Sequence, residues 1–166
     1  MQANSNWLYI VPWGLYKAIT YIKEHYGNPT VILSENGRHQ LHVLCLLKIR
    51  ILVIMWVERK QENKFEINID VCFAGMDDPG NVTISKGLHD TTRINYYRAY
   101  LTQLKKAVDE GANVIGYFAW SLLDNFEWRS GYTSRFGIVY IDYTNLKRYP
   151  KMSAYWFKRL LQRNKH

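Results

Sequence analysis

The chain has 166 residues, of which 48% are hydrophobic and 15% aromatic, a composition that indicates a globular domain and excludes a disordered polypeptide. Its formal net charge of +8 would suit an acidic partner such as nucleic acid, but the positive charges are scattered along the sequence. The sequence also has no RNA-binding signature and no zinc-finger spacing. We therefore expect no nucleic-acid partner.

The first part of the chain has the pattern of a helix followed by a buried strand. In LYKAITYIKEHYG, residues 15–27, the apolar residues recur at helical spacing, and Gly27 is a suitable C-terminal cap. Asn28 and Pro29 turn the chain, and TVILSENG at 30–37 then has the composition of a short strand with a polar tip. This is one helix–strand step of an α/β protein.

A second helix–strand step follows in the latter half. Residues 90–111 have apolar side chains at a 3.6-residue period, with Asp90 as a good N-cap and Gly111 closing the helix. Residues 114–120 are a continuous apolar run, typical of a parallel strand buried on both faces. Residues 153–164 predict an amphipathic terminal helix. Two such steps with polar tips indicate parallel barrel strands that present functional groups at their C-terminal ends.

Acidic and aromatic side chains gather at the tips of both predicted strands. Glu35 ends the first strand, and Trp120, Asp124, Glu127 and Trp128 lie within nine residues after the second. Sugar rings stack on aromatic faces and sugar hydroxyls donate to carboxylates, so this combination suits a sugar-binding site. From spacing alone, a glutamate such as Glu35 is more often a solvated loop residue beside a turn, whereas the second group could equally be a core aromatic cluster with surface acids.

Four segments resemble family 1 glycoside hydrolases, the retaining β-glucosidases of the (β/α)8 barrel type. SENG at 34–37 resembles the family's nucleophile motif. VIGYFAWSLLDNFEWRSGYTSRFGIVYIDYTNLKRYP at 114–150 resembles its C-terminal region, especially in plant members. Two further segments resemble the same family in the same order, WLYIVPWGLYKAI and MDDPGNVTISKGLHDTTRINYYRAYL. The resemblance covers residues 3–37 and 76–161.

This resemblance implies an α/β fold that is a partial (β/α)8 TIM barrel, covering about its last two β/α units. Residues 1–37 and 76–166 would be the C-terminal part of the barrel of a glycoside hydrolase, and residues 38–75 an insert. A complete barrel needs about 250 residues. We expect the insert to be irregular or a stray helix, and the two barrel strands to have unpaired edges and exposed apolar faces.

The resemblance also implies roles for single residues. Glu35 would be the catalytic nucleophile, attacking the anomeric carbon of a β-glucoside to form a covalent glycosyl-enzyme. Trp120, Glu127 and Trp128 would line the glucose subsite, and Phe136 would close the same pocket. No metal or organic cofactor is implied, because carboxylates alone carry out this chemistry.

The family's general acid/base lies in an earlier Asn-Glu-Pro motif, and this sequence contains no such motif. Loss of the proton donor slows the first half-reaction by roughly 10²–10⁴-fold. We therefore expect that this chain alone does not hydrolyse glycosides. The alternative function is a non-catalytic truncated product with residual sugar binding through Trp120, Glu127 and Trp128.

The insert at 38–75 has three interpretations. Residues 41–57 could be a transmembrane span, but 17 residues are few for that purpose, and Lys48 and Arg50 lie in the middle. The insert could also be a genuine inserted substructure, or a translated intron. We favour the intron, because deleting 38–75 joins SENG directly to MDDPGN as in the family. We accordingly expect no membrane partner.

Sequence features leave the localisation open. Asn81, with Thr83 two residues later, fits an N-glycosylation sequon, which matters only in an exported protein. Family members are often secreted, vacuolar or plastidial. The first residues, MQANSNWLYIVPWG, lack the basic and apolar regions of a signal peptide.

The intron hypothesis predicts the codons at both joins. Gly37 and Arg38 can be written G|GT AGG, and Ala74 and Gly75 as GCA G|GA, which supplies a GT donor and a CAG acceptor in the same codon phase. Removing the sequence between them regenerates one glycine codon. Genomic sequencing should show GT and AG at these two points, and codons without them would exclude the intron.

Overall fold

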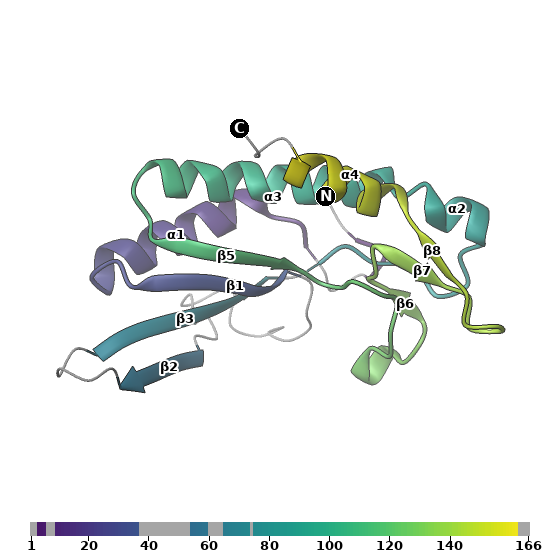
Figure 1. Ribbon diagram of the computed structural model, residues 1–166, viewed down its shortest axis with the longest axis horizontal. Coiled ribbons are helices and arrows are strands. Elements are labelled where there is room, and N and C mark those ends of the chain that lie inside the picture. The colour runs from purple at the N-terminus through teal and green to yellow at the C-terminus, as the bar shows by residue number, and fades with distance from the viewer. Residues whose placement is uncertain (1–2, 6–8, 37–53, 60–64, 74, 163–166) are drawn as a thin grey trace. The chain divides into compact units, whose positions relative to one another are not determined.

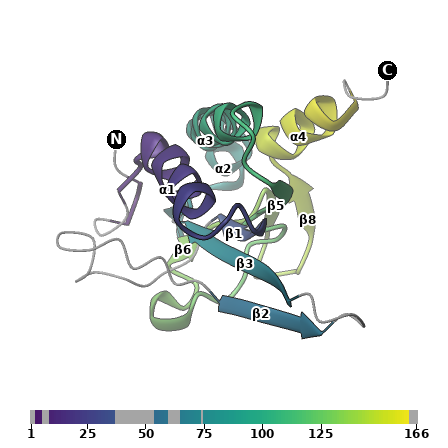
Figure 2. The ribbon, with the colours of Figure 1, turned by 90° about the vertical axis from the view of Figure 1, so that its left-hand side faces the viewer.

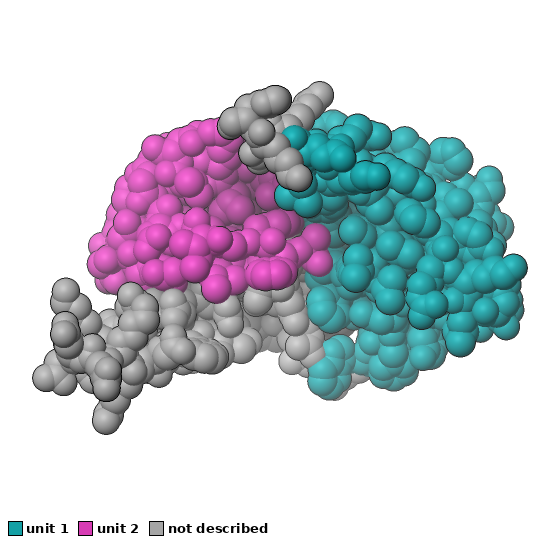
Figure 3. Space-filling model, viewed as in Figure 1, with its two compact units in different colours: residues 1–10, 75–98, 120–166 teal, residues 11–74, 99–119 magenta. Residues whose placement is uncertain are grey.

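The structure is a computed structural model that divides into two compact units, coloured separately in Figure 3. Unit 1 comprises residues 1–10, 75–98 and 120–166, and unit 2 comprises residues 11–74 and 99–119. The structure describes residues 3–5, 9–36, 54–59, 65–73 and 75–162, with no side-chain description for 34–36, 54–59, 65–73 and 129. Each unit is described by itself.

The described helices and strands are labelled in chain order in Figure 1. The elements are α1 (Pro12–His25), β1 (Thr30–Asn36), β2 (Ile54–Arg59), β3 (Phe65–Phe73), β4 (Asp78–Pro79), α2 (Ile84–Leu88), α3 (Thr91–Asp109), β5 (Val114–Ala119), the 3-10 turn η1 (Trp128–Ser130), β6 (Ser134–Arg135), β7 (Val139–Ile141), β8 (Arg148–Pro150) and α4 (Met152–Gln162).

Unit 2 is a sheet covered by helices on one face. Its strand order is β2–β3–β1–β5, with β1 parallel to both of its neighbours and β2 antiparallel to β3. Figures 1 and 2 show α1 and the C-terminal part of α3 on the same side of this sheet. Leu15, Ile19 and Ile22 of α1 are buried together with Val31 and Leu33 of β1. The two helix–strand steps predicted from the sequence are therefore confirmed as elements.

Local sequence explains where the two long helices begin and end. α1 starts at Pro12, earlier than the expected residue 15, because the fixed φ of proline suits the first helical turn. Gly27 adopts a φ of +70° and Gly111 a φ of +91°, conformations that glycine accepts without strain and that stop each helix. α3 follows directly after Asp90, as predicted.

The insert differs from the expectation of irregular structure or a stray helix, because residues 54–59 and 65–73 form strands β2 and β3. The sequence FEINIDVCF alternates apolar and polar residues at every second position, which is the pattern of a strand. β3 also pairs in parallel with an edge of β1 for which the sequence offers no barrel partner, with a register shift between Ile32 and Glu35. The expectation of an unpaired edge is therefore wrong at this position.

The proposed membrane span at 41–57 lies mostly outside the described residues, and its last four residues belong to β2. Among the helices that the structure describes, none is long and apolar enough to cross a bilayer. The join at Gly37 also lies outside the described residues.

Residues 114–120 have the sequence of a strand buried on both faces, but the expectation of exposed apolar faces in this chain is confirmed. Ile115 is 67% and Phe118 61% exposed. β5 is the last strand at one side of the four-stranded sheet, so within the described part of the chain no strand pairs with its outer edge. The apolar sequence suits a buried strand, but the elements that would bury it are not among those described.

Unit 1 is organised by buried charges on α3 and on the segments that follow β5. Arg93 of α3 is completely buried, and each of its five N–H groups donates a hydrogen bond. The acceptors are the carboxylates of Asp78 and Asp90 and the carbonyl oxygens of Met76, Arg135 and Phe136. This one guanidinium therefore links segments that are distant in the sequence.

Asp90 connects the start of α3 with α4. Its carboxylate accepts from the backbone N–H of Ser153 at 2.9 Å and from the Ser153 hydroxyl at 2.5 Å, in addition to Arg93. Burial raises the pKa of Asp90, although these hydrogen bonds act in the opposite direction.

Candidate functional site

Glu35 lies near the C-terminal end of β1 in unit 2. Its backbone is opposite Cys72 of β3, and the next residue, Asn36, is opposite Ala119 of β5. This is the end of a parallel strand at which functional groups of α/β proteins lie. The orientation of the Glu35 side chain is outside the description, and its role as nucleophile stays a prediction.

Trp120 and Glu127 are brought together in unit 1. The indole Nε1 of Trp120 donates a hydrogen bond to Oε1 of Glu127 at 2.9 Å, and Glu127 is buried. The Glu127 backbone also exchanges hydrogen bonds with Gly131, at 2.8 Å and 3.1 Å, which closes a tight turn. The Trp120 indole therefore orients the Glu127 carboxylate, and the turn with Gly131 fixes the Glu127 backbone.

Trp128 and Phe136 have different environments in unit 1. Trp128 begins η1 and is 65% exposed, so its ring presents an aromatic surface. Phe136 is buried, and its carbonyl oxygen accepts from Arg93 at 2.9 Å and from the backbone N–H of Ser121 at 3.2 Å. Phe136 thus lies within the interior of unit 1, and nothing in the structure tests its predicted contact with sugar.

Asp124 holds the segment 120–127 against the strands that follow it. Its carboxylate accepts from Nη1 of Arg135 at 2.8 Å, the backbone N–H of Gly137 at 3.0 Å, Nζ of Lys151 at 3.2 Å and the backbone N–H of Ile141 at 3.3 Å. With four donors and a buried side chain, Asp124 is a scaffold residue. All four donors to its carboxylate oxygens belong to unit 1.

Arg135 is part of the same scaffold. Its guanidinium lies between two rings, 4.2 Å from the centroid of Tyr140 and 4.4 Å from that of Tyr143. It also donates to the carbonyl oxygens of Gly80 and Ile141, each at 2.8 Å. This environment agrees with a scaffold role for Arg135.

Tyr97 supports Trp120 from α3, a relationship that the sequence alone does not reveal. The Tyr97 hydroxyl donates to the backbone oxygen of Trp120 at 3.0 Å. Burial raises the pKa of Tyr97 to about 12, so the hydroxyl remains a protonated donor at neutral pH. In the sequence, Tyr97 is one of several apolar residues at helical spacing, and that pattern gives no sign of a polar partner.

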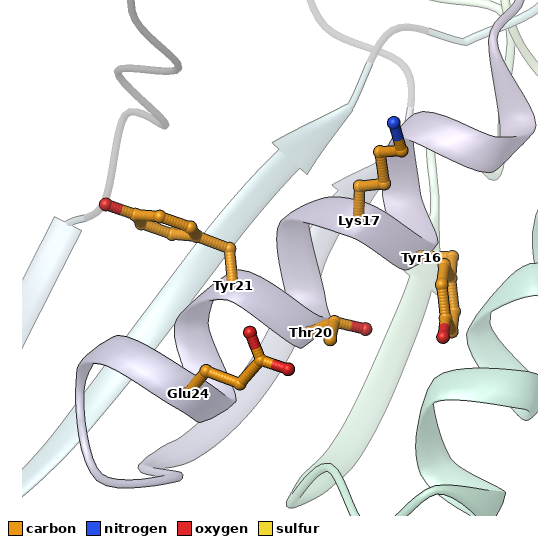
Figure 4. Close-up of a pocket in the computed structure, with 5 residues that line it drawn as sticks. All are labelled: Tyr16, Lys17, Thr20, Tyr21 and Glu24. Atoms are coloured by element: carbon orange, nitrogen blue, oxygen red, sulfur yellow. The ribbon is translucent and has the colours of Figure 1, made fainter.

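A hollow along the surface of α1 is lined by Tyr16, Lys17, Thr20, Tyr21 and Glu24. Figure 4 shows that these side chains all come from one helix and that Lys17 and Tyr21 are directed away from the other three. The Tyr16 hydroxyl donates to the carboxylate of Glu110 at 2.6 Å. Because the whole lining comes from the surface of one helix, we assign no catalytic site to this hollow.

The structure also bears on the glycosylation sequon and on groups of possible metal ligands. Asn81 is exposed after β4, so its predicted glycosylation is sterically compatible with the fold and stays a prediction. Among the described residues, no three His, Cys, Asp or Glu side chains lie together in the way that a metal ion requires.

Comparison with known proteins identifies the family. The profile of glycosyl hydrolase family 1 matches residues 47–166. Over 163 residues, or 98% of this chain, the sequence is 60% identical to beta-glucosidase 44 of Arabidopsis thaliana, of which it covers 24%. The chain belongs to glycosyl hydrolase family 1, whose solved members are (β/α)8 barrels.

Solved structures agree with this assignment. The rice Os3BGlu6 β-glucosidase is 41% identical with a TM-score of 0.70, over 95% of this chain and 26% of that one. A β-glucosidase of the fungus Humicola insolens, solved in complex with glucose, is 31% identical with a TM-score of 0.69, over 98% of this chain and 27% of that one. The chain thus spans about a quarter of the length of the relatives it matches.

The scaffold around Asp124 depends on a glycine at position 137. A Cβ atom on Gly137 would collide with the backbone of Leu123 and Asp124. We predict that Gly137→Ala lowers the free energy of unfolding by about 3 kcal/mol, because backbone atoms cannot move aside. Urea unfolding followed by tryptophan fluorescence measures this change.

Gly14→Ala is the matched control for this substitution. Its Cβ would meet only the Val11 side chain, at 3.7 Å, and it lies in α1, where alanine favours the helix by about 0.5–1 kcal/mol. Equal stabilities for the two alanine variants would contradict the close packing of Gly137 on the segment 120–127.

Proposed function

We propose that this chain is the C-terminal part of a retaining β-glucosidase, carrying the nucleophile and part of the glucose subsite. The family assignment and the plant β-glucosidase relatives support the reaction class. The observation that carries the sugar-binding part is the hydrogen bond from Trp120 Nε1 to the buried Glu127 carboxylate. This pair combines an aromatic surface with an oriented acceptor, which recognition of a sugar ring and its hydroxyls needs.

Glu35 is the proposed nucleophile. Its carboxylate would attack the anomeric carbon while the bond to the leaving-group oxygen breaks, giving a covalent glycosyl-enzyme that water then hydrolyses. A mutant of the rice Os3BGlu6 enzyme was solved in a covalent complex with Glc, which supports such an intermediate in a relative. The position of Glu35 at the end of β1 suits this role, because a rigid strand would hold the carboxylate.

Glu127 is proposed to accept hydrogen bonds from sugar hydroxyls, while Trp120 and Trp128 supply apolar ring faces. The exposed ring of Trp128 supports this assignment. Phe136 is proposed to limit the pocket from the interior side. The substrate class is a small β-glucoside, and the scaffold of Asp124 and Arg135 would fix the segment that carries these groups.

β1 and β5 are proposed to be the last two strands of the barrel, with residues 1–37 and 76–166 as barrel sequence and 38–75 as a translated intron. The parallel pairing of β1 with β5, and the helix α3 between them in sequence, support this arrangement. The absence of an Asn-Glu-Pro motif in the sequence supports a chain that lacks the proton donor.

The isolated chain is predicted not to hydrolyse an aryl β-glucoside, because no group would protonate the leaving oxygen. The assay compares the chain with its Glu35→Gln variant after both are shown to be folded by circular dichroism. The expected result is equal, background release of the aryl alcohol. Turnover by the chain that Glu35→Gln abolishes would contradict the prediction.

The second candidate function, non-catalytic sugar binding, is favoured by the Trp120–Glu127 hydrogen bond, which already orients the acceptor. Titration with glucose should then change tryptophan fluorescence in a saturable way. Glu127→Gln should weaken the binding by about tenfold or more, since it replaces a charged acceptor by a neutral amide. Asp109→Asn is the matched control, because Asp109 is an exposed carboxylate on α3. A chain without any saturable response would exclude this function.

A further inference from the structure

Both edges of β1 are occupied by parallel strands. On one edge, Val31 is opposite Val114 and Ile32 is opposite Gly116 of β5. On the other edge, β3 runs alongside from Thr30, opposite Asn68, to Asn36, opposite Phe73. β3 therefore pairs with this edge at both ends of β1, up to the tip that carries Glu35, with a register shift between Ile32 and Glu35.

The two neighbours of β1 reach it in different ways. β5 is parallel to β1 and is separated from it in sequence by α3, which is how successive strands of a (β/α)8 barrel are related. β3 instead pairs antiparallel with the preceding β2, from Ile54 opposite Asp70 to Arg59 opposite Phe65. A barrel of parallel strands has no place for β2, so β3 occupies an edge that a preceding barrel strand would use.

The face of the sheet opposite the helices carries apolar side chains that the rest of a barrel would bury. The Cβ position of Gly116 points toward Ile32, at 3.4 Å from its Cγ2, and toward the ring of Phe118. These three residues therefore share the face opposite to that of the buried Val31 and Leu33. Phe118 is 61% exposed on that face, and barrel interiors are filled by apolar side chains from all strands.

We infer that the β1 edge is a docking surface for a parallel strand from the preceding part of a family 1 barrel, and that the β2–β3 hairpin of this chain blocks it. Three observations identify a preceding barrel strand as the occupant. The chain covers about a quarter of each relative, the strands of a (β/α)8 barrel are all parallel, and β3 already pairs with this edge as a parallel strand. The inference rests on the proposed function only in taking the chain as part of a barrel.

Tethering explains why the hairpin would prevail. A strand in the same chain acts at an effective concentration of about millimolar, so a separate partner at micromolar concentration would be disfavoured by roughly 10²–10³-fold. The alternating sequence FEINIDVCF further suits β3 to a sheet with one covered face. Removing the hairpin would leave β1 with a free edge of the kind that recruits another strand.

The test measures complex formation with the part of Arabidopsis beta-glucosidase 44 that precedes the matched region, tagged and co-expressed with the chain. Three forms are compared with the full chain: a deletion of 38–75 that joins Gly37 to Met76, the double variant Asn68→Pro with Ile69→Pro, and the control Asn68→Ala with Ile69→Ala. Successive N–H groups of a strand point to opposite sides, so two adjacent prolines remove one donor toward β1 whatever the orientation.

The deletion and proline forms should bind the tagged partner at least about 10²-fold more tightly than the full chain and the alanine control. Full-chain binding as tight as that of the deletion form would overturn the inference, as would a lack of binding by every form. Hydrogen exchange of β1 amides in the chain alone should accelerate with the prolines and not with the alanines. Unchanged exchange would also overturn it.

Complex formation is measured without substrate, so its failure is distinct from failure of the proposed function. A complex that forms with the deletion form but cleaves no aryl β-glucoside would contradict the proposed function. That result would leave the docking surface intact.

Discussion

The backbone hydrogen bonds along the two edges of β1 determine which strands can form the sheet of unit 2. A parallel strand must satisfy the N–H and C=O groups of both edges, and helices α1 and α3 cover only one face of the sheet. β5 satisfies one edge with a strand that suits a barrel, whereas β3 satisfies the other with a strand that does not. Ile115 and Phe118 are exposed on β5, at which, among the described residues, the sheet stops.

Unit 1 positions a long irregular segment after β5, and the buried cations Arg93, Arg135 and Lys151 all contact it. Arg93 gathers three backbone carbonyl oxygens and two carboxylates, and Arg135 binds Asp124 between two tyrosine rings. Removing one partner of such a network leaves a buried charge without compensation, which destabilises a fold more than the pair itself stabilises it. The Trp120–Glu127 hydrogen bond lies on this framework, so its geometry depends on groups outside the proposed sugar contacts.

The sequence predicts the parts of this fold that depend on local patterns. α1 and α3 are predictable because their apolar spacing and glycine stops act within a few residues, and Trp120 and Glu127 are predictable as a pair because they share one short motif. The five-donor environment of Arg93 is not predictable, since its acceptors come from positions 76, 78, 90, 135 and 136. β3 escapes prediction although its alternation is plain in FEINIDVCF, because a strand also needs a partner edge, and the partner is β1.

We propose that residues 1–37 and 76–166 are barrel sequence with a working nucleophile, and that the β2–β3 hairpin between them prevents assembly. The most direct measurement replaces the matched region of Arabidopsis beta-glucosidase 44 by this chain, with and without residues 38–75, and follows hydrolysis of an aryl β-glucoside. The chimera without 38–75 should be active and should lose that activity with Glu35→Gln, and the chimera with 38–75 should be inactive. Equal activity of the two chimeras, or a folded but inactive chimera without 38–75, would contradict the account.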